Sequence, residues 1–355
     1  MSLLINLSFI LTKPTGTTNY AFNLLPHLKS LKPTLLTSQS FPNYNSYQTP
    51  VNQTSEQGIK GHLRRLIWTQ FQLPEISKNL KSSLLFSPLP EAPLYSNCRF
   101  VITSFDTIPL RFPKRFSPLI PYHRYYTPQV LKQAEHIICI SQTTAQDITN
   151  FYGIPANKIT PILLAHDRTH FYPLNLPTRN YFLYIGRQEP YKNIQRLIAA
   201  FAALPNCKDY ELWLAGPSDR RYTPTLKAQV AELSITTQVK FLDYIPDSEL
   251  PKIINQAIAL VFPSLWEGFG LPVLEAMACG TPVITSNLSS LPEVAGDAAI
   301  LINPYNTGEI TEAMQGIATD LGLRSRLSSQ GITHSQQFSW EKTGKATVEV
   351  LSRYL

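Results

Sequence analysis

The segment from Ala259 to Ile284 constrains the fold of this chain more than any other part of it. It reads as a buried strand, a glycine-containing loop, a helix that ends at a glycine and a proline, and a second strand. Such a crossing presents free loop amides and a helix N-terminus, which together can hold a phosphate group. Glu267 lies in the loop and Glu275 inside the helix, where their carboxylates can bind hydroxyl groups on either side of that phosphate. The pattern predicts a parallel α/β fold and is typical of a nucleotide-sugar site.

A second strand-to-helix crossing adds two cations to the same chemistry. An apolar strand over 181–185 runs into Gly186, and Arg187 and Lys192 follow before an amphipathic helix. Arginine offers a planar fork to phosphate oxygens and lysine a compact charge, so together they can neutralise a diphosphate. An exposed salt bridge to Glu189 or to a neighbouring helix would be the favoured interpretation of this loop alone. Beside the first segment, diphosphate binding is the favoured interpretation.

The two loops together form a recognisable motif. A Gly-Arg-x4-Lys-Asn motif at 186–193 is followed by Trp-Glu-Gly-Phe-Gly at 266–270 and then by Glu275. This combination strongly resembles the retaining glycosyltransferases of family 4, whose similar members transfer mannose or related sugars in polysaccharide and O-antigen assembly. The resemblance covers nearly all of 178–355 and is looser over 1–170. Further matching stretches are 215–216, 239–242, 291–294, 296–299 and 338–341, and, in the N-terminal part, 16–28, 86–94, 105–113 and 138–154.

The resemblance implies an α/β fold of two facing Rossmann-like domains, the GT-B architecture, with a C-terminal helix that crosses back to the first domain. It places an N-terminal acceptor-side domain at 1–172, a C-terminal nucleotide-sugar-binding domain at 178–337 and the returning helix at 338–355. The alternation of apolar runs with helical stretches independently favours mostly parallel sheets. A polar segment at 41–58 is expected to be a long loop, and 171–178 the interdomain linker. The expected strands are 3–11, 34–36, 83–86, 100–104, 136–140, 181–185, 211–215, 239–242, 257–262, 282–285 and 299–302.

The residues that match the motif take their roles from the resemblance. Arg187 and Lys192 are implied to balance the negative charge that grows on the leaving diphosphate, and Glu267 to hold hydroxyls of the transferred sugar. These three are the implied catalytic residues, and Glu275 is implied to bind the ribose diol. The other implied donor-binding residues are Gly16, Gly186, Gly268, Phe269 and Gly270.

The implied reaction moves a mannose-like hexose from a nucleotide-diphosphate sugar to a hydroxyl of a glycan or lipid-linked saccharide acceptor. Retention would come from front-face attack with the departing phosphate as base, so no protein nucleophile, metal or other cofactor is expected. His166 and His170 have helical metal-ligand spacing, but Pro161 and Pro173 bracket them, and no metal site is expected there. The base, the sugar, the acceptor, the linkage and the oligomeric state stay open.

One position departs from the family pattern. Close relatives usually have His-Asp where this chain has Phe105-Asp106, and that histidine commonly contacts the donor sugar or the reacting centre. Phe105 cannot donate a hydrogen bond. The acceptor-side candidates are therefore Asp106, His123 and Arg124, with His123 or Arg124 as candidate replacements for the missing imidazole. The departure equally allows an altered sugar preference, or a degenerate nucleotide-sugar-binding module without transfer activity.

Two other enzyme classes use paired carboxylates or nucleotide sugars. Glycosidases need two carboxyl groups about 5 to 9.5 Å apart across one bond. However, a hydrolase acting on a plain glycoside has no use for Arg187 and Lys192 beside the site. A nucleotide-sugar epimerase would need an acid/base pair, and the sequence offers no convincing one. A transferase is the favoured interpretation, with the degenerate binding module as the alternative.

Charge is distributed unevenly along the chain. Residues 1–170 have 16 Lys and Arg against 7 Asp and Glu, a net charge of +9, whereas 171–355 have 15 against 17. The basic segments 60–68 and 111–116 predict a peripheral contact with an anionic membrane or with a phosphorylated acceptor. A solvated helix face with an ordinary buried Trp68 is an equally good interpretation. No nucleic-acid recognition module is found, so nucleic acid is not an expected partner.

Length and composition bound the remaining choices. A chain of 355 residues predicts about two domains. The apolar run 3–11 is interrupted by Asn6 and Ser8, is too short to span a bilayer and has no basic segment before it, so it is expected to be a strand and not a signal peptide. The four cysteines lack any Cys-x-x-Cys pair and are expected to be reduced core residues. A cytoplasmic location is expected, with peripheral attachment at the inner face of the membrane.

Overall fold

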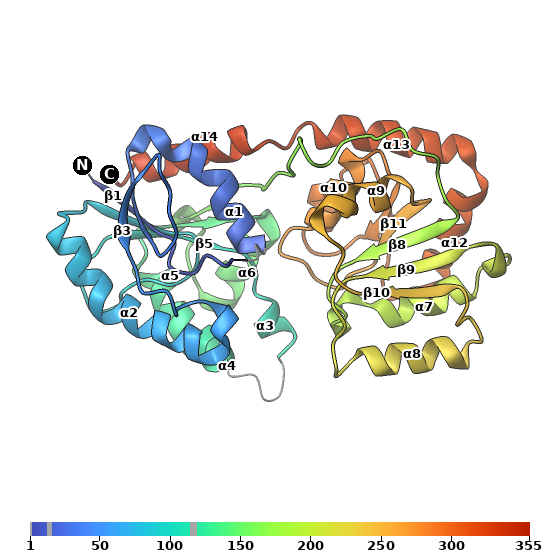
Figure 1. Ribbon diagram of the computed structural model, residues 1–355, viewed down its shortest axis with the longest axis horizontal. Helices are drawn as coiled ribbons and strands as arrows, with labels where there is room; N and C mark the ends of the chain where they lie inside the picture. Colours follow the sequence, from blue (N-terminus) through green and yellow to red (C-terminus); the bar gives the residue numbers. More distant parts are fainter. Residues whose placement is uncertain (1, 13–15, 114–118) are drawn as a thin grey trace. The chain divides into compact units, whose positions relative to one another are not determined.

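The computed structural model describes residues 2–12, 16–113 and 119–355. The chain divides into two compact units (Figure 1). The first contains Met1–Leu164 together with Trp340–Leu355, and the second contains Ala165–Ser339. The segment 171–178 lies inside the second unit.

The first unit is built on a seven-stranded sheet with the order β3-β2-β1-β4-β5-β6-β7, in which each neighbouring pair is parallel. Strands such as β1 and β5 are buried along their whole length, because helices cover both faces of a parallel sheet. The strands are β1 (Leu3–Asn6), β2 (Thr34–Thr37), β3 (Asn45–Gln48), β4 (Leu84–Ser87), β5 (Phe100–Ser104), β6 (His136–Cys139) and β7 (Ile159–Pro161). The helical segments are α1 (Gly16–Leu24), η1 (Leu25–Leu31), η2 (Ser55–Gln57), α2 (Gly58–Asn79), α3 (Ile108–Arg111), α4 (Leu119–Pro121), η3 (Tyr122–Tyr126), α5 (Thr127–Gln133), α6 (Gln142–Tyr152), η4 (Ala156–Lys158) and α14 (Trp340–Ser352).

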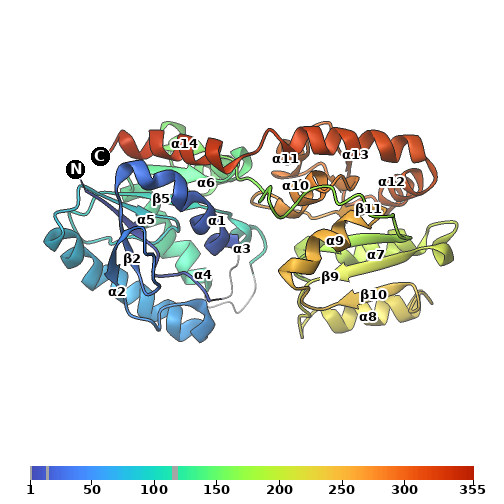
Figure 2. The same cartoon turned by 45° about the horizontal axis from the view of Figure 1, so that its top comes forward.

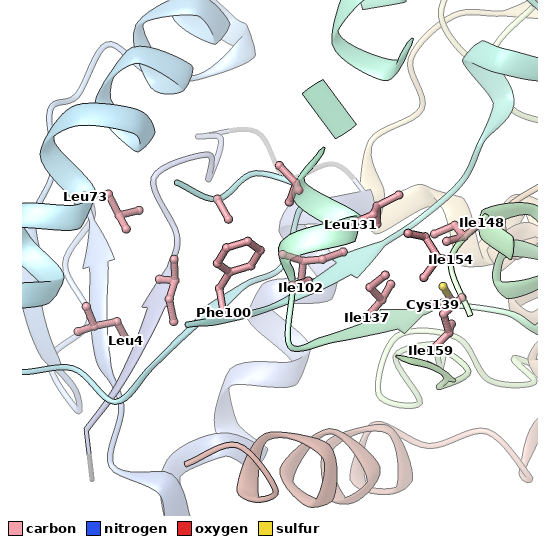
Figure 3. Close-up of a cluster of buried hydrophobic side chains, with 14 of the residues drawn as sticks. Leu4, Leu73, Phe100, Ile102, Leu131, Ile137, Cys139, Ile148, Ile154 and Ile159 are labelled. Atoms are coloured by element: carbon pink, nitrogen blue, oxygen red, sulfur yellow. The ribbon is translucent and has the colours of Figure 1, made fainter. Parts of the chain in front are cut away.

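A cluster of buried side chains joins this sheet to its helices (Figure 3). Leu4 of β1 and Phe100 and Ile102 of β5 belong to the same cluster as Leu73 of α2 and Leu131 of α5. Full burial of one such side chain contributes about 2 kcal/mol. The cluster therefore fixes α2 and α5 on the sheet and sets the position of the residues that these helices present elsewhere.

The second unit is built on a six-stranded parallel sheet with the order β10-β9-β8-β11-β12-β13. Its strands are β8 (Tyr181–Ile185), β9 (Glu211–Ala215), β10 (Val239–Leu242), β11 (Ala259–Phe262), β12 (Val283–Ser286) and β13 (Ile300–Ile302). Its helical segments are η5 (Pro190–Lys192), α7 (Ile194–Ala202), η6 (Cys207–Asp209), α8 (Thr223–Glu232), η7 (Asp247–Glu249), α9 (Leu250–Asn255), α10 (Leu271–Ala278), α11 (Leu291–Ala295), α12 (Thr307–Thr319) and α13 (Leu321–Ser335). Strand order changes direction between β8 and β11, and doubly wound sheets bind ligands at the carboxyl ends of the strands at such a point. The two parallel sheets confirm the predicted Rossmann-like architecture.

The last helix, α14, belongs to the first unit, as predicted. It packs along η1 and α1 (Figure 2). The backbone of α14 approaches η1 so closely at Gly344 that an added Cβ would lie 2.2 Å from the Cβ of His27. The hydroxyl of Thr343 also donates a 2.7 Å hydrogen bond to the carbonyl of Leu163. The end of the chain therefore completes the unit that the beginning of the chain builds.

Two expectations for the first unit are wrong. The segment 41–58 is not a loop throughout, because β3 lies within it and pairs with β2 at the edge of the sheet. All four residues of β3 are exposed, so backbone pairing forms the strand without any alternation of apolar residues. The apolar run 3–11 is not one strand, because β1 ends at Asn6. The Asn6 side chain accepts hydrogen bonds from the amide (3.2 Å) and the hydroxyl (2.8 Å) of Ser8, which turns the chain there.

The described residues contain no disulfide, no helix that could span a membrane and no cluster of metal ligands. The four cysteines are unpaired thiols, and Cys139 and Cys279 are buried. No helix in the described ranges is long and apolar enough to cross a membrane. Within residues 2–12, 16–113 and 119–355, no group of three or more His, Cys, Asp or Glu side chains is placed to hold a metal ion. Metal independence of the reaction stays a prediction.

Candidate functional site

The loop after β8 starts at a glycine that the geometry requires. Gly186 and Gly216 have φ values of 151° and 140°, which L side chains rarely adopt. A Cβ added to Gly216 would lie 2.1 Å from the carbonyl oxygen of Gly186, so the loops after β8 and β9 touch through their backbones. The buried hydroxyl of Tyr184 donates a 2.9 Å hydrogen bond to the carbonyl of Arg187 and fixes the course of the loop.

Asn193 anchors the far end of this loop. It adopts a left-handed conformation (φ 61°) and is 1% exposed. Its side-chain amide donates hydrogen bonds to the carbonyls of Pro263 (3.1 Å) and Pro304 (2.7 Å), while its oxygen accepts one from Arg196 (2.8 Å). The loop after β8 is thereby tied to the end of β11. The sequence motif contained this asparagine but gave no hint of its structural role.

Lys192 and Glu267 meet between the two loops. The Lys192 Nζ lies 2.5 Å from Oε1 of Glu267, and both side chains are about nine-tenths enclosed. The ammonium also lies 5.2 Å from the ring centroid of Phe262, within cation–π range. Two residues implied as catalytic are therefore in direct contact, although they are 75 positions apart in the chain.

Arg187 differs from Lys192 in its surroundings. Its side chain is exposed, and within the described part of the chain it forms no ion pair. The alternative of a salt bridge between Arg187 and Glu189 is therefore not realised. A guanidinium that pairs with no carboxylate of the described residues, at the carboxyl end of β8, is available to an anionic ligand.

The loop after β11 is held from the side of α11. The hydroxyl of Ser290 lies 3.0 Å from the carbonyl oxygen of Glu267 and 2.7 Å from that of Phe269. The amide of Glu267 donates a 3.1 Å hydrogen bond to the hydroxyl of Ser289. Gly270 (φ 114°) is the N-cap residue of α10. Sequence reasoning missed both serines, because their role depends on contacts with residues more than 20 positions away.

The candidate donor-binding residues of this loop are enclosed. Gly268, Phe269 and Gly270 are all buried. The ring of Phe269 is 3% exposed and packs edge-on against Phe338, with ring centroids 6.2 Å apart. Phe269 can therefore offer a ligand its backbone more readily than its side chain. Gly16, the candidate from the other unit, is exposed at the first residue of α1.

Glu275 lies on α10 in a half-buried position. Burial, with a smaller contribution from the negative charge of Asp247, raises the pKa of its carboxyl to about 7. Asp247 in turn lies 3.4 Å from the imidazole of His170. A carboxyl whose pKa is near neutrality on a helix that follows a buried glycine loop is a marker of a functional site.

The first unit contains a cavity of about 510 Å³ that brings two of the three acceptor-side candidates, Asp106 and His123, together. Phe105, Asp106 and His123 line it, whereas Arg124 does not and is exposed beside the ring of Tyr125. The cavity is lined by Thr17, Ser55, Gly58, Ile59, His62, Arg65, Leu89, Pro90, Glu91, Ser104, Phe105, Asp106, Tyr122, His123, Thr127 and Tyr152.

Phe105 adds an aromatic ring to the lining of this cavity, and His123 adds an imidazole. The Phe105 ring packs edge-on against the buried Tyr20, with ring centroids 5.1 Å apart. Burial, with a smaller contribution from His62, lowers the pKa of His123 to about 4. His123 is therefore neutral near pH 7, and its imidazole can both donate and accept a hydrogen bond. Asp106 accepts a 3.0 Å hydrogen bond from the amide of Ile108.

The basic segments predicted to bind anions are only partly exposed. Arg65 is buried and forms a two-point ion pair with Glu91, at 2.7 and 2.8 Å. Trp68 is also buried, so the interpretation of an ordinary core tryptophan holds for it. In the other segment, Arg111 pairs with the buried Asp147. Residues 114–116 of that segment lie outside the described residues.

The chain is similar to known proteins along most of its length. Residues 167–334 match the family model for glycosyl transferases group 1, and residues 14–170 match that for glycosyltransferase family 4. The chain is 31% identical over 263 residues to the O-antigen chain mannosyltransferase B of Escherichia coli, covering 70% of this chain and 68% of that one. It is 27% identical to the O-antigen chain mannosyltransferase RfbU of Salmonella typhimurium, covering 89% of this chain and 90% of that protein.

The fold of the chain is similar to that of solved structures. The Anabaena protein HepE, in complex with UDP and glucose, superposes with a TM-score of 0.76 at 18% identity, covering 99% of this chain and 100% of the other. At this identity the likeness concerns the fold alone. The two family models and the 31% identical mannosyltransferase show that this chain belongs to the family 4, group 1 glycosyltransferases and is an enzyme of the hexosyltransferase class.

Proposed function

We propose that this enzyme transfers a mannose-like hexose from a nucleotide-diphosphate sugar to a hydroxyl of a glycan or lipid-linked saccharide, with retention at the anomeric carbon. The observation on which the proposal depends most is the contact of Lys192 with Glu267 beside the exposed Arg187. Two cations suited to phosphate and a carboxylate suited to sugar hydroxyls thus occur on one pair of loops, which supports the proposal. The curated relatives named above are mannosyltransferases, which supports mannose as the sugar.

The donor is assigned to the second unit. Arg187 and Lys192 would bind the diphosphate, together with amides of 268–270 at the start of α10. Glu267 would hold hydroxyls of the sugar, and Glu275 the ribose diol. In the reaction, the bond between the anomeric carbon and the phosphate oxygen breaks, and its electron pair stays on the diphosphate. A preorganised cation or amide that meets this charge contributes about 3 kcal/mol to the transition state.

The acceptor is assigned to the cavity of the first unit. Its hydroxyl oxygen would form the new bond on the face that the diphosphate leaves, and its proton would pass to the departing phosphate oxygen. His123 is the cavity residue best suited to orient that hydroxyl, because it is neutral and lies with Phe105 and Asp106 in the lining. No protein nucleophile and no metal ion is expected in this scheme. The proposed location is the cytoplasm, where peripheral attachment would bring the enzyme to the inner face of the membrane.

The test is a donor screen followed by a transfer assay. Thermal unfolding of the full chain is followed with GDP-mannose, GDP-fucose, UDP-glucose, UDP-N-acetylglucosamine, dTDP-rhamnose and the free nucleotides, without added metal. A donor present at 100 times its dissociation constant stabilises the folded state by about 2.7 kcal/mol. The donor that binds is then incubated with saccharide and lipid-linked acceptors. Binding without transfer to any acceptor of a wide panel would instead support the degenerate module.

A further inference from the structure

The solvent-facing side of α2 has an apolar stripe that the core does not use. The buried side of this helix includes Trp68 and Leu73. Large apolar side chains four residues apart point instead to solvent; they are Ile59, Leu63, Ile67 and Phe71, with exposed fractions of 64%, 55%, 51% and 71%. A surface helix normally turns such residues towards the core, and contiguous exposed apolar side chains mark interaction sites. These four residues are called the α2 stripe below.

Two cations lie directly beside the α2 stripe. Lys60 and Arg64 are exposed and follow Ile59 and Leu63 by one position, and in the described part of the chain neither forms an ion pair. No Asp or Glu occurs on α2 before residue 75. Arg65 differs from both, because it is buried and its charge is balanced by Glu91. The exposed side of the first turns of α2 is thus apolar and positively charged.

We propose that this face of α2 docks onto an anionic membrane surface, with the α2 stripe at the level of the lipid headgroups and Lys60 and Arg64 against lipid phosphates. A helix with apolar side chains beside Lys and Arg lies in the plane of a bilayer interface. Cations near an anionic leaflet strengthen such binding. A second copy of this chain fits less well, because a symmetric dimer through the α2 stripe would bring the cations of both copies together.

The docking face adjoins the cavity of the first unit. Gly58, Ile59 and His62, all at the start of α2, line that cavity together with Asp106 and His123. Docking would therefore hold the cavity close to the membrane surface, where a lipid-linked saccharide presents its hydroxyls. The docking specifies the surface for the peripheral attachment included in the proposed function, and this last step also rests on the lipid-linked acceptor of that function.

The test is co-sedimentation of the full chain with vesicles of equal parts phosphatidylglycerol and phosphatidylcholine, and with vesicles of phosphatidylcholine alone. Leu63→Ser/Ile67→Ser removes the middle of the α2 stripe without touching the cavity lining, and Lys60→Gln/Arg64→Gln removes the two cations. Leu321→Ser, on a 70% exposed leucine of the second unit, is the matched control. The wild type and the control should bind the anionic vesicles alike. The stripe variant should bind about tenfold more weakly, and the charge variant should lose most of its preference for the anionic lipid.

Equal binding of the wild type and the stripe variant would overturn the proposal, as would a wild type that ignores anionic vesicles. So would a concentration-dependent dimer, seen by sedimentation velocity, that the stripe variant abolishes without any vesicle binding. The unfolding temperature of each variant shows that it is folded. The shift of that temperature by the nucleotide-sugar donor, measured without vesicles, reports on the proposed function separately. A docking failure leaves that shift intact, whereas a wrong donor assignment removes the shift and leaves docking intact.

Discussion

Nζ of Lys192 and Oε1 of Glu267 lie 2.5 Å apart across the two loops of the second unit, and both side chains are largely enclosed. The cation proposed to meet the diphosphate and the carboxylate proposed to hold the sugar thus neutralise each other in the free enzyme. An incoming diphosphate must compete with Glu267 for the ammonium. The same exchange releases the carboxylate for hydroxyl groups, so binding of the phosphate and binding of the sugar are coupled.

This coupling predicts opposite effects on two measurements for Glu267→Gln. The amide keeps the shape of the side chain but no longer neutralises Lys192, so the free nucleoside diphosphate should bind at least as tightly as it does to the wild type. Sugar transfer should fall about 100-fold, because a contact that strengthens in the transition state is lost. Calorimetric titration with the nucleoside diphosphate and a transfer assay measure the two effects. Parallel loss of both would show that Glu267 merely supports the loop.

We expect the side-chain hydrogen bonds of Asn193 to stabilise the folded protein, and a control variant separates this effect from the strain of the left-handed backbone. Asn193→Ala leaves the buried carbonyls of Pro263 and Pro304 without donors, which should cost about 3 kcal/mol of unfolding free energy. Asn175→Ala is the control, because Asn175 has a similar φ of 52° but is exposed. It should cost only about 1 kcal/mol. Urea unfolding of both variants is the measurement, and similar costs would mean that backbone strain, not the two hydrogen bonds, dominates at Asn193.

The raised pKa of Glu275 predicts that the free energy of unfolding depends on pH. Its pKa is about 7 in the folded protein against an ordinary 4.5, so the folded state holds a proton that the unfolded chain has already released. The stability associated with this proton is present below pH 4.5 and is lost as the pH rises through 7. Glu275→Gln should therefore gain about 2 kcal/mol of unfolding free energy relative to the wild type between pH 5 and pH 8.

The exposed Glu232, on α8, supplies the comparison for Glu275. Glu232→Gln should differ from the wild type by the same amount at pH 5 and at pH 8. Urea unfolding of the wild type and both variants at pH 5 and at pH 8 measures these differences in unfolding free energy. A gain for Glu275→Gln that does not change with pH would contradict the raised pKa as its cause.

We expect substitution of His123 to slow sugar transfer without weakening donor binding. His123→Phe removes the neutral imidazole from the cavity that contains Phe105, and transfer should slow by about tenfold while the donor-induced thermal shift is unchanged. Tyr125→Ala alters a neighbouring residue that is 66% exposed and outside the cavity lining, and it should transfer at the wild-type rate. If Arg124→Ala slowed transfer and His123→Phe did not, the assignment of His123 would be wrong.

The local features of the second unit could be predicted because they depend on neighbours in the chain. Apolar runs followed by Gly186 and by the glycines at 268 and 270 gave the two strand–loop–helix crossings at nearly their observed positions. The contact of Lys192 with Glu267 could not be predicted from spacing, because it requires β8 and β11 to be neighbours in the sheet. That strand order is a property of the whole unit.

The first unit was less predictable, for physical reasons that differ from case to case. Strand β3 has no apolar alternation, because its pairing with the edge of the sheet needs only backbone groups. Arg65 looked like a surface cation, and only its pairing with Glu91, 26 positions later, allows it to be buried. The α2 stripe shows the converse, because a helical apolar pattern does not reveal which of two apolar sides faces the sheet.

The return of α14 to the first unit has a consequence for how the protein is made. Ribosomes deliver the chain from its N-terminus, and domains usually fold in the order in which they emerge. Here the strands of the first unit emerge early, but the helix that packs Gly344 against His27 follows the whole second unit along the chain. The second unit, 165–339, is a complete stretch of chain before that helix exists. The first unit is therefore completed only after the whole second unit has emerged.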